Sequence, residues 1–193
     1  MMSAQSPVRA RILDSAGRLF GADSIRSVSA DKVIADAGTT KVTFYRHFRS
    51  KDHLVVAYLD GQLDDLRAAA EAQRTAGGDA CAVLLRLAAA NGEIACRPGF
   101  RGCTFINAAA EYPADGVVRD AVERYRTWLH EVVTGLLVEL GADHPDVVAD
   151  QLIMLRDGAM VHGFMGDPAA VADALVTAGR AIITAHLPAQ QHP

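Results

Sequence analysis

Residues 29–48, SADKVIADAGTTKVTFYRHF, contain two short helical patterns separated by a glycine turn. Ser29 is placed to cap a first helix, and Gly38 to end it through a positive φ. Thr39 or Thr40 is placed to cap a second helix, which runs to about residue 48. Two short helices joined by a tight turn that contains glycine are the format of a helix-turn-helix. The stretch therefore predicts a small helical unit that displays its second helix.

The helical period of apolar residues extends over the rest of the chain. One apolar stripe over residues 8–20 precedes the two short helices, and a longer stripe over residues 55–70 follows them. Five further helical segments follow, and none of the sequence shows sustained alternation with a period of two. We predict an all-α protein of about nine helices, with a three-helix helix-turn-helix domain over residues 1–50 and a helical bundle over residues 51–193.

The charge is distributed unevenly along the chain. Residues 1–55 hold nine basic and five acidic side chains, a net charge of +4, within a whole-chain charge of −4. Residues 56–193 hold ten basic and 18 acidic side chains, a net charge of −8. This asymmetry indicates an anionic partner for residues 1–55. Chance clustering of nine basic residues is the plain alternative.

The second short helix has one aromatic side and one polar side. Phe44 and Phe48 are four residues apart, so they can both face the core. The side chains left mostly outward are Lys41, Thr43, Tyr45, Arg46 and His47. Lysine can donate to guanine, threonine can pack on a thymine methyl group, and tyrosine and histidine can reach phosphates. An ordinary polar helix face is the alternative, but the turn, the aromatic pair and the local positive charge together favour DNA.

Residues 37–52, AGTTKVTFYRHFRSKD, resemble the DNA-binding signature of TetR/AcrR-type transcriptional regulators. The resemblance extends to the nine-helix arrangement and to the length of the chain. It implies base contacts from one end of the second helix and phosphate contacts around it. The residues with implied base contacts are Thr40, Lys41, Val42 and Thr43. Those with implied phosphate or backbone contacts are Tyr45, His47, Lys51 and Ser29.

The chain departs from the family pattern at four positions. Val42 stands where glycine is frequent, Thr39 where an apolar residue is usual, and Ile34 where alanine is customary. Asp31 puts an acid near the expected DNA surface, where it either accepts from cytosine N4 or turns away. These departures concern which operator sequence is bound, not whether DNA is bound.

For residues 51–193, the resemblance implies a homodimer formed through the last two helices and a small-molecule pocket within each subunit. A bound effector would swing the fourth helix and release a repressor from a palindromic operator. The pocket candidates are apolar or aromatic side chains with polar neighbours, which suit a hydrophobic effector of modest size. They are Phe100, Cys103, Phe105, Ile106, Asn107, Tyr112, Trp128, Met154, His162, Phe164 and Met165. For each of them, ordinary core packing is the alternative.

Small residues at helical spacing mark the last two helices, including Gly158, Gly163 and Ala174. They let helices approach closely, either between two chains or within one, and the sequence leaves both readings open. The three cysteines show no paired spacing, and the histidines show no metal-ligand spacing, so we expect reduced thiols, no metal and no cofactor.

Other function classes have little support in the sequence. No hydrolase triad order, HExxH motif or glycine-rich phosphate loop occurs, so we expect no enzyme. No apolar run is long enough to span a membrane and no secretory signal is expected, so we predict a cytoplasmic protein without a membrane partner. One alternative is a small-molecule-binding or catalytic helical protein whose basic N-terminal segment docks on an acidic protein. Another is a non-specific architectural DNA binder, which the net negative charge of residues 56–193 disfavours.

Overall fold

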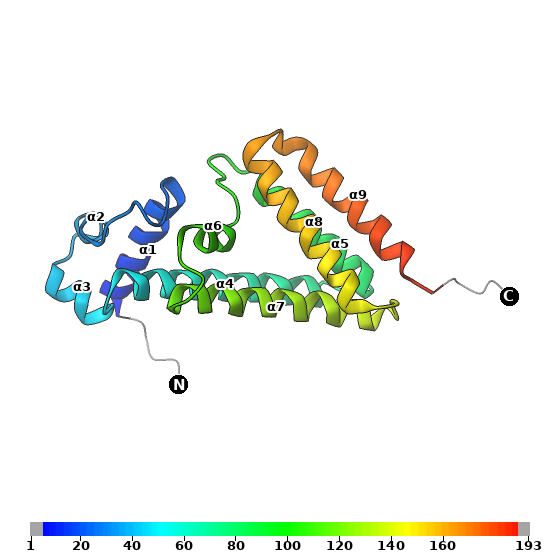
Figure 1. The fold of residues 1–193 in the computed structure, drawn as a ribbon, viewed down its shortest axis with the longest axis horizontal. Coiled ribbons are helices and arrows are strands. Elements are labelled where there is room, and N and C mark those ends of the chain that lie inside the picture. Colours follow the sequence, from blue (N-terminus) through cyan, green and yellow to red (C-terminus); the bar gives the residue numbers. More distant parts are fainter. Residues whose placement is uncertain (1–5, 189–193) are drawn as a thin grey trace. The chain divides into compact units, whose positions relative to one another are not determined.

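The computed structural model describes residues 6–188, and within them the chain forms nine α-helices and no β-strand (Figure 1). The helices are α1 (Pro7–Ala22), α2 (Ala30–Asp36), α3 (Lys41–His47), α4 (Lys51–Thr75), α5 (Ala80–Ala95), α6 (Thr104–Glu111), α7 (Val117–Glu139), α8 (Pro145–Met165) and α9 (Pro168–Ala185). The prediction of an all-α fold with an N-terminal helix-turn-helix is confirmed. No helix within this part of the chain is both long and apolar enough to cross a membrane.

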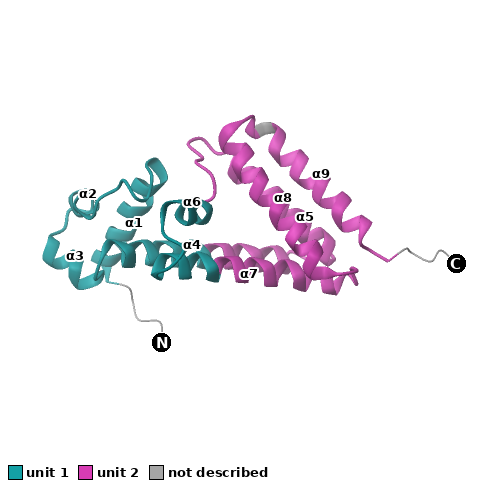
Figure 2. Ribbon diagram, viewed as in Figure 1, with its two compact units in different colours: residues 1–64, 104–124 teal, residues 65–103, 125–193 magenta. Residues whose placement is uncertain are grey.

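The helices form two compact units (Figure 2). Unit 1 comprises Met1–Asp64 and Thr104–Arg124, and unit 2 comprises Asp65–Cys103 and Tyr125–Pro193. The helix-turn-helix thus shares its compact unit with the first half of α4, with α6 and with the start of α7. The functional boundary that we place at residue 50 remains a prediction.

Unit 1 is held together by an apolar core and by polar ties between α1 and α2. Ile12, Val33 and Phe44, one from each of the first three helices, are fully buried. The hydroxyl of Ser15, itself buried, donates to the Asp36 carboxylate, which also accepts a bond of 2.7 Å from Arg18. These contacts fix α2 on α1 and so define the support from which α3 projects.

Unit 2 is built on the close packing of α5, α8 and α9. A Cβ atom added at Gly92 on α5 would lie 2.6 Å from the Cα of Ala172 on α9, and one at Gly163 on α8 would lie 2.7 Å from the Cβ of Ala95. Only glycine fits at these two contacts. Gly92 and Gly163 therefore serve packing within the chain, whereas Gly158 has nothing within 4 Å and faces open space.

Candidate functional site

The turn between α2 and α3 is set by three local devices. The Ser29 side chain caps α2 by accepting the Lys32 backbone N–H at 3.1 Å, and the Thr40 side chain caps α3 by accepting the Thr43 N–H at 3.2 Å. Between them, Gly38 adopts a φ of +57°, which an L side chain rarely adopts. The predicted caps are confirmed, and of the two threonines it is Thr40 that caps α3.

α3 presents one buried and one exposed side, as its sequence predicts. Phe44 and Phe48 are buried, and their ring centroids lie 5.8 Å apart. On the other side, Val42 is 82% exposed and Tyr45 is 49% exposed. An apolar side chain as exposed as Val42 is typical of a binding surface. A thymine methyl group in the major groove is one partner that could cover it.

The lysine at the start of α3 has a partner on α2. The Nζ of Lys41 lies 3.0 Å from Oδ1 of Asp31, and both side chains are well exposed. The hydrogen bond and charge of Asp31 raise the pKa of Lys41. Of the two sequence-based alternatives for Asp31, the structure has it paired within the protein, with the lysine that is expected to meet base edges.

Two side chains expected to contact phosphates, Lys51 and His47, are partly constrained by the fold. The ammonium of Lys51 donates to the Arg26 carbonyl oxygen at 2.9 Å, and burial lowers its pKa. Lysine has three donors, so this bond leaves two for a phosphate. The Nε2 atom of His47 is buried and has no hydrogen-bond partner among the described residues. A phosphate contact by the His47 ring in this position would therefore use Nδ1.

A carboxylate that sequence reasoning did not assign anchors α6 to the loop between α1 and α2. Oε2 of Glu111 accepts from the Ser24 hydroxyl at 2.9 Å and from the Arg26 backbone N–H at 2.7 Å. The Arg26 guanidinium also donates to the Glu111 carbonyl oxygen at 3.1 Å. Nearby, burial raises the pKa of Tyr112 to about 12, with Asp52 and Glu111 adding to the effect. No sequence pattern signals this clasp, because it joins residues 85 and more positions apart.

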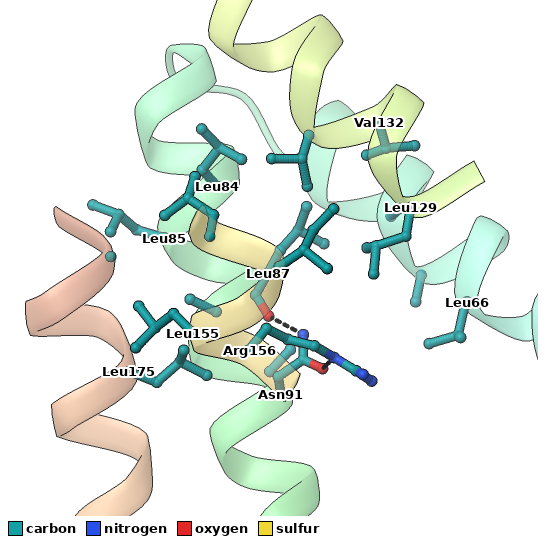
Figure 3. Close-up of a pocket in the computed structure, with 18 of the residues that line it drawn as sticks. Leu66, Leu84, Leu85, Leu87, Asn91, Leu129, Val132, Leu155, Arg156 and Leu175 are labelled. Atoms are coloured by element: carbon teal, nitrogen blue, oxygen red, sulfur yellow. Dashed lines mark hydrogen bonds between the residues drawn. The ribbon is translucent and has the colours of Figure 1, made fainter. Parts of the chain in front are cut away.

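Unit 2 contains an apolar cavity of about 150 Å³ (Figure 3). Its walls come from α4, α5, α7, α8 and α9, and most of the lining side chains are leucine, isoleucine, valine and alanine. Tyr125 and Trp128 add two aromatic rings, and Asn91 and Arg156 add polar groups. Figure 3 shows Asn91 and Arg156 together on one side of the site, with Leu84 and Val132 on the other. The cavity fits a small, largely apolar molecule.

Of the eleven residues predicted to line a pocket, the structure places Trp128 in the wall of this cavity. Cys103 is buried and contacts Arg156, which does line it. The others lie elsewhere, for three reasons. Phe105, Ile106, Asn107 and Tyr112 belong to unit 1. Met154, His162, Phe164 and Met165 are exposed on α8, and Phe100 lies in the α5–α6 loop beside Gly163.

Arg156 is the buried cation of the cavity wall. Its Nε donates to Asn91 Oδ1 at 3.2 Å, its Nη1 to Asp157 Oδ1 at 2.9 Å, and its Nη2 to Cys103 Sγ at 3.4 Å. The guanidinium also lies 5.9 Å from the centre of the Tyr125 ring. Burial by itself would lower the pKa of Arg156, but Cys103, Tyr125 and Asp157 raise it. The residue therefore stays charged inside an apolar wall.

Metal ligation has no support in the part of the chain that the structure describes, which holds no group of three or more His, Cys, Asp or Glu side chains suited to share a metal ion. His130 has a neighbour in Asp150, at 3.6 Å, on the rim of a second and more polar depression.

Comparison with known proteins identifies the class. Residues 12–58 match the model of the bacterial regulatory proteins of the tetR family. A TetR-family transcriptional regulator from Streptomyces coelicolor shares 37% sequence identity, with 93% of this chain and 95% of that chain covered and a TM-score of 0.88. The chain belongs to the TetR family. A comparison with curated proteins gives no match.

More distant structures share the TetR-family fold. One from Streptomyces avermitilis is 22% identical, covers 91% of this chain and 99% of its own, and has a TM-score of 0.77. One from Saccharomonospora viridis, determined in complex with choline, is 19% identical, covers 95% of this chain and 98% of its own, and has a TM-score of 0.79. Membership of the family makes this chain a DNA-binding transcriptional regulator of helix-turn-helix type, in a family that is not generally enzymatic.

Proposed function

We propose that this TetR-family chain is a dimeric repressor that a small hydrophobic effector releases from a palindromic operator. The observation that carries the proposal is the exposed side of α3, where Lys41, Val42 and Tyr45 stand clear of a buried aromatic pair. Thr40 and Thr43 flank this side, and Ser29, His47 and Lys51 surround it as phosphate contacts. A short exposed helix with side chains of this chemistry fits the major groove.

The dimer is proposed from an apolar stripe along α8. Val147, Met154 and Val161 follow one another at intervals of seven residues, and Met165 continues the line one turn later. All four side chains are at least 46% exposed, and Gly158 lies open between them. A stripe of this spacing is typical of a seam between helices. We propose that a second copy of the chain covers it, so that α8 and α9 form the subunit interface.

The effector is proposed to occupy the cavity in unit 2. α4 supplies Leu66 and Ala70 to its wall and begins at Lys51 beside the helix-turn-helix, so one continuous helix belongs to both the cavity and the proposed DNA-binding surface. An effector that favours a different position of α4 changes the spacing between the two helix-turn-helix units of the proposed dimer, and so lowers its affinity for the operator. The choline of the Saccharomonospora viridis structure supports a small-molecule role for this fold, although the buried Arg156 makes a cation a poor occupant here.

The test is DNA binding by fluorescence anisotropy with a fragment from upstream of the chain's own gene and with single-base variants of the bound site. Lys41→Ala is expected to lose about 1–3 kcal/mol of binding free energy and to relax preference at one base pair. Lys51→Ala is expected to weaken binding to all sequences alike and to lower the salt dependence. Uniform weakening by both substitutions would remove Lys41 from the base contacts, and no binding at low salt would defeat the proposal.

A further inference from the structure

The cavity in unit 2 combines an apolar body with one buried positive charge. Its volume is about 150 Å³, and protein cavities of this size hold molecules about as large as benzene. The side chains around it offer dispersion contacts over nearly the whole wall. Arg156 interrupts that wall, with a side chain that is only 14% exposed. Because desolvating a cation is costly, a buried arginine in an apolar wall favours a further anionic partner there.

The neighbours of Arg156 do not use its full donor capacity. A guanidinium has five N–H donors, and the bonds to Asn91, Asp157 and Cys103 use three of them. One N–H remains on each of Nη1 and Nη2 with respect to the described residues. The bond to Cys103 is also the most easily exchanged, because thiol sulfur is a weak acceptor. Nη1 and Nη2 can therefore turn to a pair of ligand oxygens without giving up Asp157.

The charges around Arg156 leave a surplus of one positive charge. Asp157 accepts from Arg156 through Oδ1 and from Arg126 through Oδ2, so two guanidinium groups share one carboxylate. Asn91 is neutral and holds the Arg156 Nε in place while donating to the Leu87 carbonyl oxygen at 2.8 Å. Arg126 is more exposed and is screened by solvent, so the uncompensated charge is greatest at Arg156.

We infer that the cavity takes a small amphipathic anion, whose carboxylate binds Arg156 while an aromatic or short aliphatic body fills the apolar space. A carboxylate matches the forked geometry of a guanidinium and neutralises the surplus charge. A cation of the same size meets repulsion at Arg156, and a neutral amide gains only ordinary hydrogen bonds. The inference rests on the proposed function, since it names the class of effector for the same cavity.

Arg156 also lies where binding of a ligand in the cavity can affect the chain segments that join unit 2 to unit 1. It contacts Cys103 and Tyr125, and these are the residues at which the chain leaves unit 2 and re-enters it. Their neighbours in sequence, Thr104 and Arg124, already belong to unit 1. A carboxylate that draws Nη2 away from Cys103 therefore loosens a contact one peptide bond from α6. In this way Arg156 links binding of the anion to release of the operator.

The experiment is calorimetric titration of the full chain, without DNA, with three probes that share one ring. They are phenylacetate, the neutral phenylacetamide and the cationic phenethylamine. We expect phenylacetate to bind roughly tenfold to a hundredfold more tightly than the amide, as charged hydrogen bonds imply, and the amine not to bind. Equal binding of acid and amide, or preference for the amine, would overturn the assignment of an anion. Failure of all three probes would overturn the cavity as a ligand site for this class.

Variants of Arg156 separate the effect of its charge from the effect of the apolar cavity on ligand binding. Arg156→Gln is expected to lose the preference for phenylacetate while still binding toluene, which shows that the apolar space has survived. Should Arg156→Gln not fold, Arg156→Lys keeps the charge, loses the forked geometry and is expected to bind phenylacetate more weakly. Arg74→Gln is the matched control, because it removes an arginine from an exposed ion pair of unit 2 and is expected to change nothing. An unchanged preference in the Arg156 variants would overturn the inference.

The operator assay distinguishes this inference from the proposed function. Phenylacetate that binds the free protein and lowers its affinity for operator supports both. Phenylacetate that binds through Arg156 without affecting DNA supports the anion site and contradicts ligand-responsive repression. If only an uncharged apolar compound releases the operator and phenylacetate does not bind, the result supports ligand-responsive repression and overturns the anion site at Arg156.

Discussion

The carboxylate of Asp31 lies 3.0 Å from the ammonium of Lys41, so α2 supplies a counter-ion to the cation that α3 is proposed to bring to the bases. In the proposed complex, DNA competes with Asp31 for Lys41, and Asp31 also repels phosphate. An exposed pair of this kind contributes little to stability. Its effect is expected in binding rather than in folding.

Asp31→Asn is therefore expected to raise the affinity for operator and for unrelated DNA alike, by about twofold to tenfold at low salt. Titrations at about 50 mM and about 200 mM salt measure the gain, which shrinks as salt screens the charge. Asp65→Asn is the control, because it removes an exposed carboxylate from α4 within unit 2. An unchanged or lower affinity for Asp31→Asn would mean that the pair positions Lys41 for DNA instead of restraining it.

Val42→Ala is expected to leave stability within about 0.5 kcal/mol, because the side chain is 82% exposed. Affinity for operator is expected to fall about fourfold, the value of roughly one buried methyl group. Replacing the contacted thymine by uracil removes the partner methyl and should cost wild type a similar factor. The variant should then show no further loss on uracil DNA. Independent losses from the two changes would exclude a contact between Val42 and a thymine methyl.

Glu111→Ala is expected to lower the free energy of unfolding by about 1 kcal/mol, because the Ser24 hydroxyl and the Arg26 N–H lose their acceptor. Glu111→Gln keeps an oxygen in the same place and should lose less. Urea unfolding of the two variants measures the difference. Equal losses would show that the charge of Glu111, not its hydrogen bonds, holds α6 to the α1–α2 loop.

Asp36→Asn is expected to destabilise the protein at neutral pH and to matter less in acid. The hydrogen bond from Ser15, followed by Arg18, lowers the pKa of Asp36 below its ordinary value of 3.8. A carboxyl whose pKa is lowered by folding stabilises above the ordinary pKa, and this contribution is lost as the pH falls through the folded value. Unfolding midpoints of wild type and variant should thus converge below about pH 3.8. A constant difference at every pH would assign the effect to packing.

Phe164→Glu is expected to convert the proposed dimer to monomer, because it puts a charge on the exposed apolar side of α8. Sedimentation velocity reports the change in mass. Val138→Glu is the matched control, since Val138 is also an exposed apolar residue but lies on α7. Dissociation by the α7 variant alone would move the interface away from α8.

The helix-turn-helix was open to prediction because its determinants are local. Ser29, Gly38 and Thr40 act within a few residues of their own positions, and the pair Phe44 and Phe48 follows from helical spacing alone. Asp31 was visible as an acid near the surface, but its pairing with Lys41 depends on how α2 meets α3.

The cavity was not open to prediction in the same way. Aromatic and sulfur-containing side chains were reasonable candidates for its wall, yet Phe105 lies in unit 1 and Met154 is exposed on α8. The wall consists mostly of leucine and alanine, which look like any core in sequence. Arg156 was the available signal, as a lone arginine in the middle of an apolar helix. Its burial depends on contacts with residues 53 and 65 positions away, Cys103 and Asn91.

The contact between Gly92 and Ala172 makes one wall of the cavity stiff. The backbones of α5 and α9 are already in close contact at Gly92 and Ala172. The two helices therefore cannot move closer together, and no side chain lies between them that could rearrange. Leu66, Ala69 and Ala70 stand on α4, outside that tight contact. We expect an occupant larger than the resting space to be accommodated on the side formed by α4 and α7. In the proposed role of the cavity, the size of a bound effector would therefore be expressed as movement of α4 and α7.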